Sequence, residues 1–145
     1  MIFTILGKPQ GKGRPRFSTK GKFVSTYTPE KTKEYENLVQ ESFLRQCKGQ
    51  YDKDYVGEVK VKIIAYFEPP KSMSKKKYKE LIDGRFGYLH KPDTDNVAKV
   101  ILDSLNGLAY KDDNQVSCLL VIKEYAETSK VEVEIEYLWW LIWKD

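Results

Sequence analysis

The 145-residue sequence predicts one domain of the α+β class. The expected order is strand, helix, strand, two helices and two final strands. The short polar segment 127–129 separates the final strands, which predicts that they form an antiparallel hairpin. A sheet built partly from a hairpin favours an α+β fold over a doubly wound parallel sheet. The length matches a single domain over 1–145 that is large enough to bury a core.

The N-terminal part of the chain predicts a strand, a loop and a helix. Residues 1–8 are a short apolar run rich in β-formers, which indicates a buried strand. Residues 7–22 hold four glycines and two prolines, so we expect a flexible basic loop there. Thr28 and Pro29 predict a helix start, with Thr28 as N-cap and Pro29 as the first helical residue, and the helix should end near 47–49. Four residues recur at helical spacing and should face the core: Tyr35, Leu38, Val39 and Phe43.

The other elements follow from the same kinds of pattern. Residues 57–68 alternate apolar and lysine side chains, which is typical of a half-buried strand. The lysine-rich segment 72–84 predicts a short helix with a solvated basic face, and DNA contact by these lysines is the lesser alternative. An amphipathic helix is expected over 95–107, and strands over 116–126 and 130–140. The aromatic end of the last strand should complete the core, with a subunit interface as the next interpretation.

Composition excludes several classes of protein. With 41% hydrophobic and 32% charged residues the chain is not a disordered tail, and no stretch approaches the ~20 apolar residues of a membrane-spanning helix. The first residues put apolar side chains before basic ones, the reverse of a secretory signal. Cys47 and Cys118 lie far apart and lack the spacing of a zinc site, so we expect reduced thiols. These observations predict a cytoplasmic protein without membrane contact.

Positive and negative charges are separated along the chain. Residues 1–29 contain six Lys or Arg and no acidic residue, whereas 90–116 contain five Asp and three Lys. Contacts from Lys and Arg to phosphate are the main sequence-independent source of nucleic-acid affinity. We therefore expect Lys12, Arg14 and Arg16 to contact DNA phosphates. The alternatives are a mobile solvated loop, and a basic charge that only aids solubility.

The five aspartates surround the helix expected over 95–107. Capping of the helix would explain one of Asp93 and Asp95, because an N-cap needs only one oxygen, but it does not explain both. Lys99 lies one turn after Asp95 on the same side of the helix. A short return of the chain after the helix would bring Asp112 and Asp113 back near its first residues.

Several carboxylates that converge repel one another unless a cation neutralises them, so the pattern predicts a metal site. The candidate ligands are oxygens, which favours Mg²⁺ or Mn²⁺ over zinc. Carboxylate-held Mg²⁺ can activate water toward a phosphodiester, and a neighbouring lysine can add positive charge at the transition state. An EF-hand starting at Asp93 is excluded, because it would need an oxygen ligand, a glycine and a glutamate where Val97, Ala98 and Ser104 stand.

Three segments together resemble the signature of the RusA family of Holliday-junction resolvases, which are crossover junction endodeoxyribonucleases of bacteria, their phages and their prophages. The segments are Lys91-Pro92-Asp93-Thr94-Asp95-Asn96, then Lys99, and then Asp112-Asp113-Asn114-Gln115-Val116. The resemblance extends more loosely over most of the chain, because the family also tends to begin with a strand, a glycine-rich basic segment and a helix.

The resemblance implies roles that the residues alone do not establish. It implies that Asp93, Asp95 and Asp113 bind Mg²⁺, which Mn²⁺ can replace, and that these three residues and Lys99 carry out catalysis. It implies a two-layer RusA-like domain with helices on a mixed, mainly antiparallel sheet. It also implies a homodimer that binds a four-way DNA junction and makes paired nicks in two strands of like polarity, in DNA recombination and repair. Asp112 is a possible contributor, and Asp103 is interpreted as a solvated helix residue.

Other residues near the site carry separate interpretations. Arg85 and Lys91 are expected to contact DNA, and Phe86 and Tyr88 fit base stacking and core packing equally well. His90 is interpreted as a bystander.

Two further function classes also stay open: a DNA-binding module whose aspartates only cap and turn the chain, and a metal-dependent nuclease of flaps or plain duplex. The order Asp, Asp, Lys, Asp weighs against the binding module, which has no chemical need for it.

Overall fold

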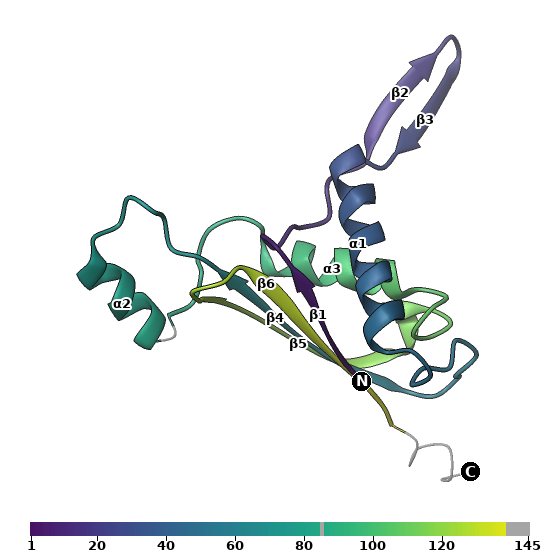
Figure 1. Ribbon diagram of the computed structural model, residues 1–145. Helices are drawn as coiled ribbons and strands as arrows, with labels where there is room; N and C mark the ends of the chain where they lie inside the picture. The colour runs from purple at the N-terminus through teal and green to yellow at the C-terminus, as the bar shows by residue number, and fades with distance from the viewer. Residues whose placement is uncertain (85, 139–145) are drawn as a thin grey trace.

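A computed structural model describes residues 1–84 and 86–138. The described elements pack around one hydrophobic core and form an α+β domain, as predicted (Figure 1). In chain order they are β1 (Ile2–Leu6), β2 (Arg16–Lys20), β3 (Phe23–Tyr27), α1 (Glu30–Gln46), β4 (Val59–Phe67), α2 (Lys75–Asp83), α3 (Thr94–Leu105), the short 3-10 helix η1 (Asp113–Gln115), β5 (Val116–Tyr125) and β6 (Lys130–Tyr137).

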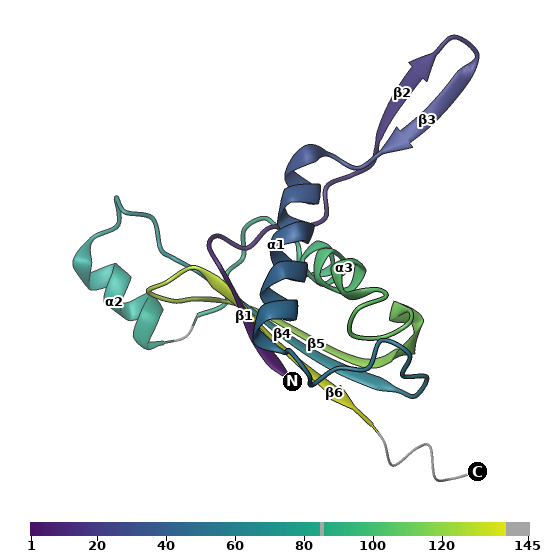
Figure 2. The ribbon, with the colours of Figure 1, turned by 45° about the vertical axis from the view of Figure 1, so that its right-hand side comes forward.

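The main sheet has four strands in the order β1-β6-β4-β5. β4 is central, antiparallel to β6 and parallel to β5, and β1 pairs antiparallel with β6. The prediction of a mixed, mainly antiparallel sheet is therefore confirmed. Every second residue of β4 is buried, and α1 and α3 both lie over that face of the sheet (Figures 1 and 2). The two layers, helices and sheet, enclose the core between them.

The predicted hairpin between the last two strands is wrong. β5 and β6 run antiparallel, but β4 lies between them. The connecting residues cross the end of β4, where Ala126 N donates to Phe67 O at 3.0 Å and Glu68 N donates to Ser129 Oγ at 3.1 Å. Two strand spacings of about 4.8 Å are within reach of a four-residue connection, so the same polar segment serves either topology. The apolar β4 gains a paired neighbour on both sides by taking the central position.

The predicted flexible loop is also partly wrong, because residues 16–27 form the β2–β3 hairpin. Its sequence is rich in Phe, Val, Thr and Tyr, which favour strands. Gly21 adopts φ +64° at the tight turn between the two strands, a conformation that glycine adopts without steric cost. The glycines and prolines that suggested a loop lie mostly before Arg16, and that part of the chain has no regular structure.

Helix boundaries and burial differ from the predictions in small ways. α1 begins at Glu30 with Pro29 at the N-cap position, one residue later than expected, and ends before Cys47. Tyr35, Val39 and Phe43 are buried as predicted, but Leu38 is 39% exposed on the flank of the helix. The predictions for α2, α3 and β4 are confirmed. The aromatic residues after Leu138 lie outside the described residues, and within the described ranges no helix is long and apolar enough to cross a membrane.

Replacing Ile63 by Ala should lower the free energy of unfolding by about 2–5 kcal/mol, because its side chain is fully buried beneath the helices. The matched control is Ile64→Ala, since Ile64 is only half-buried on the opposite face of β4 and should cost about 1 kcal/mol. Urea unfolding followed by circular dichroism measures both. Equal losses would contradict a sheet that buries only one face.

Candidate active site

Two of the predicted site residues lie at the start of α3. Asp93 occupies the N-cap position, and its backbone carbonyl accepts from Val97 N at 3.1 Å. The Asp93 side chain makes no capping hydrogen bond, and Asp95 lies in the first turn. Both side chains are exposed. Capping therefore does not account for the Asp93 carboxylate, which is free to bind another group.

The loop before α3 is held by Lys123 of β5. The Lys123 ammonium donates to His90 O at 2.8 Å and to Pro92 O at 2.7 Å. Tyr88 N donates back to Lys123 O at 3.0 Å, and the Tyr88 ring stacks on Phe67 with ring centroids 3.8 Å apart. The loop is thereby attached to the edge of the sheet, and this fixes the chain that leads to Asp93.

Sequence reasoning missed Lys123. The pairing of Lys123 with the fully buried Ala65 of β4 places this lysine on the side of the sheet that faces the helices. A lysine at such a position is the feature that could have pointed to a structural role. The nearby aromatics fitted either core packing or base stacking. Tyr88 packs against Phe67 and Tyr125, whereas the Phe86 side chain is 55% exposed. The rings of His90 and Tyr88 form a T-shaped pair with centroids 5.4 Å apart, and the interpretation of His90 as a bystander stays a prediction.

The second acidic segment is shaped by Gln115. Its side-chain oxygen accepts from Lys111 N at 2.9 Å and from Asp112 N at 3.0 Å. Its amide nitrogen donates to Tyr55 O at 2.7 Å and to Gly57 O at 3.0 Å. One amide side chain thus joins the turn at Asp112 to the segment before β4. Gln115 stood inside the recognised motif, but its positioning role could not be inferred before the fold was known.

The return of the chain brings Asp113 beside Asp112 and Asp103. Partial burial of Asp113 and the hydrogen bond and charge of Asp112, followed by Asp103, raise the pKa of the Asp113 carboxyl. Burial, followed by the charges of these same aspartates, also raises the pKa of Tyr110, whose hydroxyl donates to Leu102 O at 2.8 Å. Asp103 therefore belongs to a cluster of carboxylates, and its interpretation as a solvated helix residue is wrong.

Lys12 connects this cluster to α1. Its ammonium lies 2.6 Å from Glu36 Oε1 and 3.2 Å from Asp103 Oδ2, and its side chain is 19% exposed. Burial, the largest single influence, lowers the pKa of Lys12, but the hydrogen bonds and charges of Glu36 and Asp103 outweigh it and raise the pKa overall. The structure thus gives Lys12 two carboxylate partners within the protein, and phosphate contact by Lys12 stays a prediction.

The chain around Lys12 packs closely on the start of α3. Lys12 N donates to Asn96 O at 2.9 Å. A Cβ atom added to Gly11 would lie 2.8 Å from Pro92 Cβ and 3.0 Å from Asn96 Cβ, so only glycine allows this approach. The basic segment, residues 8–16, and the start of α3 are therefore neighbours in space, although about 80 residues of sequence separate them.

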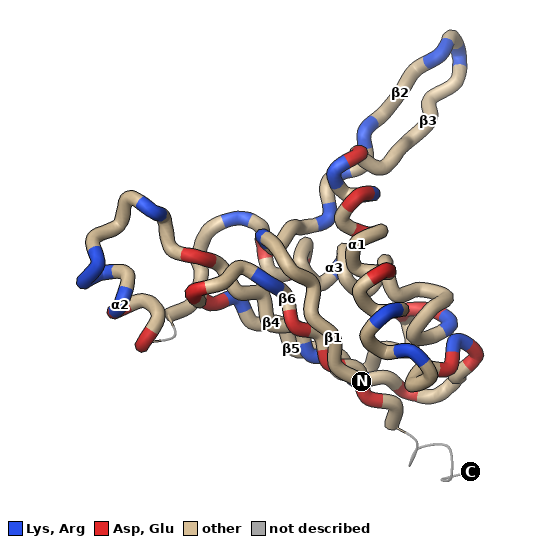
Figure 3. Tube along the Cα trace, viewed as in Figure 1, with Lys and Arg blue, Asp and Glu red and all other residues tan. Residues whose placement is uncertain are grey.

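A groove of about 830 Å³ lies between the basic segment and the start of α3. Among the described residues that line it, Asp93 is the one acidic side chain, and Asn96 and Thr32 are two of the polar ones. Six cationic residues line the groove: Lys8, Lys12, Arg14, Arg16, Lys31 and Lys91. Figure 3 shows the concentration of Lys and Arg along this end of the molecule. A groove with this positive charge favours a polyanion such as a phosphate backbone.

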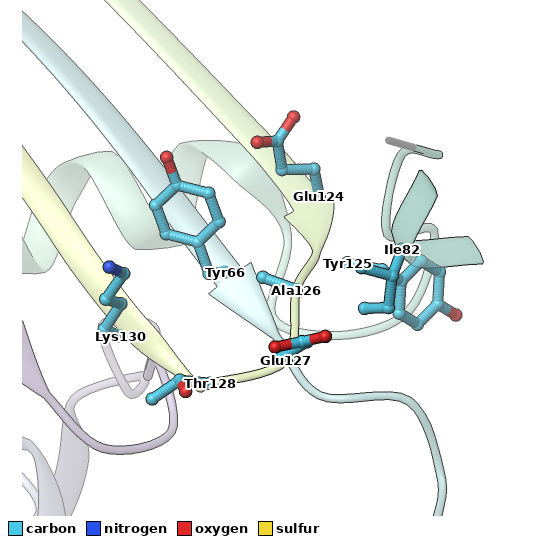
Figure 4. Close-up of a pocket in the computed structure, with 8 residues that line it drawn as sticks. All are labelled: Tyr66, Ile82, Glu124, Tyr125, Ala126, Glu127, Thr128 and Lys130. Atoms are coloured by element: carbon cyan, nitrogen blue, oxygen red, sulfur yellow. The ribbon is translucent and has the colours of Figure 1, made fainter. Parts of the chain in front are cut away.

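A second hollow, of about 450 Å³, lies at the end of β4 and β5 (Figure 4). Its side chains include Tyr66, Glu124, Glu127 and Lys130, and none of the predicted site residues lines it. Tyr66 and Glu124 are partners across the β4–β5 ladder. With two carboxylates and one ammonium, this hollow lacks the positive charge of the groove beside Asp93.

The predicted site residues are brought together only in part. Asp93 and Asp95 open α3, Lys99 is exposed one turn later, and Asp113 lies near Asp103, two turns beyond Asp95. Among residues 1–84 and 86–138 no three His, Cys, Asp or Glu side chains are close enough to hold a metal ion. Arg85 lies outside the described residues.

The donors nevertheless fit a hard divalent cation. They are carboxylate oxygens throughout. Partial burial, followed by the hydrogen bond and charge of Asp112 and then Asp103, raises the pKa of Asp113, and a cation would relieve the repulsion among these carboxylates. Metal binding by Asp93, Asp95 and Asp113 stays a prediction.

Comparison with known proteins gives a family match over most of the chain. The model of the family described as Endodeoxyribonuclease RusA matches residues 7–136. The chain is also 38% identical over 135 residues to an uncharacterized protein, YqaN, of Bacillus subtilis (strain 168). That similarity covers 92% of this chain and 93% of the relative. The matched region includes the groove, α3 and the turn at Asp113.

Replacing Lys12 by Met should lower the free energy of unfolding by about 1–3 kcal/mol, because Glu36 and Asp103 would be left partly buried without their cation. Lys8→Met is the matched control, since Lys8 is exposed on the same groove and should change stability by less than about 0.5 kcal/mol. Urea unfolding measures both. Unchanged stability of the Lys12 variant together with weaker DNA binding would show that phosphate is the partner of this ammonium.

Proposed function

This chain belongs to the RusA endodeoxyribonuclease family, and from that membership we propose that it is a structure-selective endonuclease that resolves four-way DNA junctions, known as Holliday junctions. The observation that carries the proposal is the cationic groove that ends at Asp93 and the start of α3. Phosphates bound in such a groove would lie next to Asp93, one of the carboxylates that the chemistry needs. We assign this activity to one domain over residues 1–145, acting in the cytoplasm in DNA recombination and repair.

In the proposed site Asp93, Asp95 and Asp113 hold Mg²⁺, which Mn²⁺ can replace. The bound ion would supply an activated water and stabilisation of charge on the leaving oxygen. Lys99 is exposed on the same helix and would add positive charge next to the phosphate that is cut. Asp103 would orient Asp113, and Lys12 would limit the repulsion between these two carboxylates.

The groove cations would hold the DNA backbone in register with this site. Arg14, Arg16 and Lys91 line the groove and have no carboxylate partner in the described part of the chain, so their charge is available for phosphates. Lys12 lines the same groove, and Arg85 is assigned to DNA on sequence alone. None of these contacts reads bases, which agrees with selection of DNA by its branched shape.

We further propose that the active form is a homodimer. The two strands of like polarity in a four-way junction are related by approximate two-fold symmetry, and each chain contributes one acidic site. Two symmetric chains would place one site at each strand, and a two-fold dimer is the commonest protein assembly. Paired nicks would then follow from the geometry.

Replacing Asp95 by Asn should abolish cleavage of an end-labelled four-way junction while leaving junction binding intact. The loss should exceed the about 10- to 100-fold typical of losing an outer-shell partner of a metal ligand. Asp83→Asn is the matched control, because Asp83 is an exposed aspartate at the end of α2, away from the groove lining. Cleavage is measured in Mg²⁺, in Mn²⁺ and in chelator, beside linear duplex of the same sequence, and binding by gel shift.

Three outcomes would contradict the proposal in different ways. Equal cutting of linear duplex would indicate a nuclease without branch selectivity. Tight junction binding without cleavage by the unmodified protein, across several sequences, would indicate a binding module. Cleavage that survives in chelator would exclude the assigned role of the carboxylates.

Replacing Lys99 by Met should slow cleavage of bound junction by about 100-fold, because one source of positive charge at the transition state is lost. Lys99→Arg should restore part of the rate, whereas Lys79→Met on α2 should change it little. The measurement is the single-turnover rate at saturating protein. A loss of affinity as large as the loss of rate would assign Lys99 to DNA holding instead.

A further inference from the structure

The β2–β3 hairpin projects from the rest of the molecule (Figures 1 and 2). Its two strands pair with each other and form a separate sheet. All but one of its strand residues are exposed, and Phe23 is 81% and Phe17 73% exposed. An isolated two-stranded hairpin is marginally stable in water, and large exposed aromatics usually mark a contact surface. The proposed catalytic site uses none of the hairpin beyond its first residue, Arg16.

The register separates the hairpin into two different faces. Arg16 pairs with Tyr27 and Lys20 pairs with Phe23, so two cations stand directly opposite two aromatics on one face, with serines between them. The other face has no charge and consists of Phe17, Thr19, Val24 and Thr26. Lys22 adds a further cation in the turn. We call Arg16, Lys20, Phe23 and Tyr27 the basic-aromatic face.

We propose that the β2–β3 hairpin enters the major groove of a duplex arm of the DNA substrate, with its basic-aromatic face on the nucleic acid. This inference rests on the proposed action on DNA junctions and extends it to a second contact region. The major groove is about 12 Å wide and accepts a two-stranded β-ribbon. The cations would contact phosphates, and Phe23 and Tyr27 would supply apolar contact with sugars and base edges.

Charge and position favour DNA over other partners. No acidic residue occurs in residues 1–29, so all the charge of the hairpin is positive (Figure 3). Arg16 at the hairpin base also lines the groove that contains Asp93, so DNA lying in the groove continues directly onto the hairpin. Five strand residues span about 17 Å, the length of about five base pairs, so the hairpin would contact duplex beyond the site of cleavage.

The test compares two double variants on the two faces of the same hairpin. Lys20→Gln with Phe23→Ser alters the basic-aromatic face, and Phe17→Ser with Val24→Ser alters the uncharged face. All four side chains are exposed, so the thermal midpoint of the protein should not move. Fluorescence anisotropy gives the Kd for a four-way junction with arms of about 15 base pairs, and for one with arms of about five, over a range of salt concentrations.

We expect the basic-aromatic variant to bind the long-armed junction about tenfold more weakly and to lower the salt slope by about one. The short-armed junction should be bound more weakly by the unmodified protein and should show little difference between variants. The uncharged-face variant should match the unmodified protein. These three results together support the hairpin as a duplex contact.

Other results would overturn the inference. Unchanged Kd and salt slope in the basic-aromatic variant, or equal weakening by both variants, would remove the hairpin from the DNA contact. Dissociation of a dimer by the basic-aromatic variant in sedimentation would assign this face to a second copy of the chain. Failure of the unmodified protein to bind any junction would instead refute the proposed function, and the hairpin contact with it.

Discussion

Burial of one face of β4 is the constraint on which the rest of the structure depends. β4 is paired on both sides, and every second residue from Val59 to Phe67 is buried on the face that α1 and α3 cover. α3 can cover that face of β4 only with its apolar side, which includes Val97 and Ile101. The polar side of the helix, with Asp95 and Lys99, must then face outward. The orientation of the candidate site is therefore a consequence of core packing, because a rotation of α3 that hid its carboxylates would also expose its apolar residues to water.

Polar side chains hold the segments that the core does not reach. Lys123 fixes the loop before α3 through two carbonyls, Gln115 fixes the turn at Asp112, and Lys12 joins α1 to Asp103. Each is anchored in or beside a regular element and reaches a carbonyl, an amide or a carboxylate of a neighbouring segment. Such contacts fix where the two acidic segments lie relative to α3.

The charge distribution reconciles two opposing requirements. A site made only of carboxylates would repel DNA, and a surface made only of lysine and arginine would offer no ligand for a divalent cation. Here the groove cations and Asp93 share one hollow, while Asp103 near the end of α3 lies with Asp112 and Asp113 of the returning chain. In the proposed function the cations would act at long range on a polyanion, whereas the carboxylates would act over a few ångströms. The β2–β3 hairpin, whose charged residues are all Lys or Arg, extends the positive charge beyond the groove.

The sequence by itself determined the fold class, the helices α1, α2 and α3, the strand β4, and the motif that identifies the family, because these depend on local periodicity and residue order. Tertiary structure decided what depends on partners distant in sequence. The central position of β4 overrode the expected β5–β6 hairpin, since a polar four-residue connection fits either arrangement. The strand character of residues 16–27 was hidden by the glycines and prolines around it. Four polar residues form contacts with distant segments that only the folded chain reveals: Lys12, Asp103, Gln115 and Lys123. No local pattern shows which carboxylate or carbonyl a polar side chain will contact.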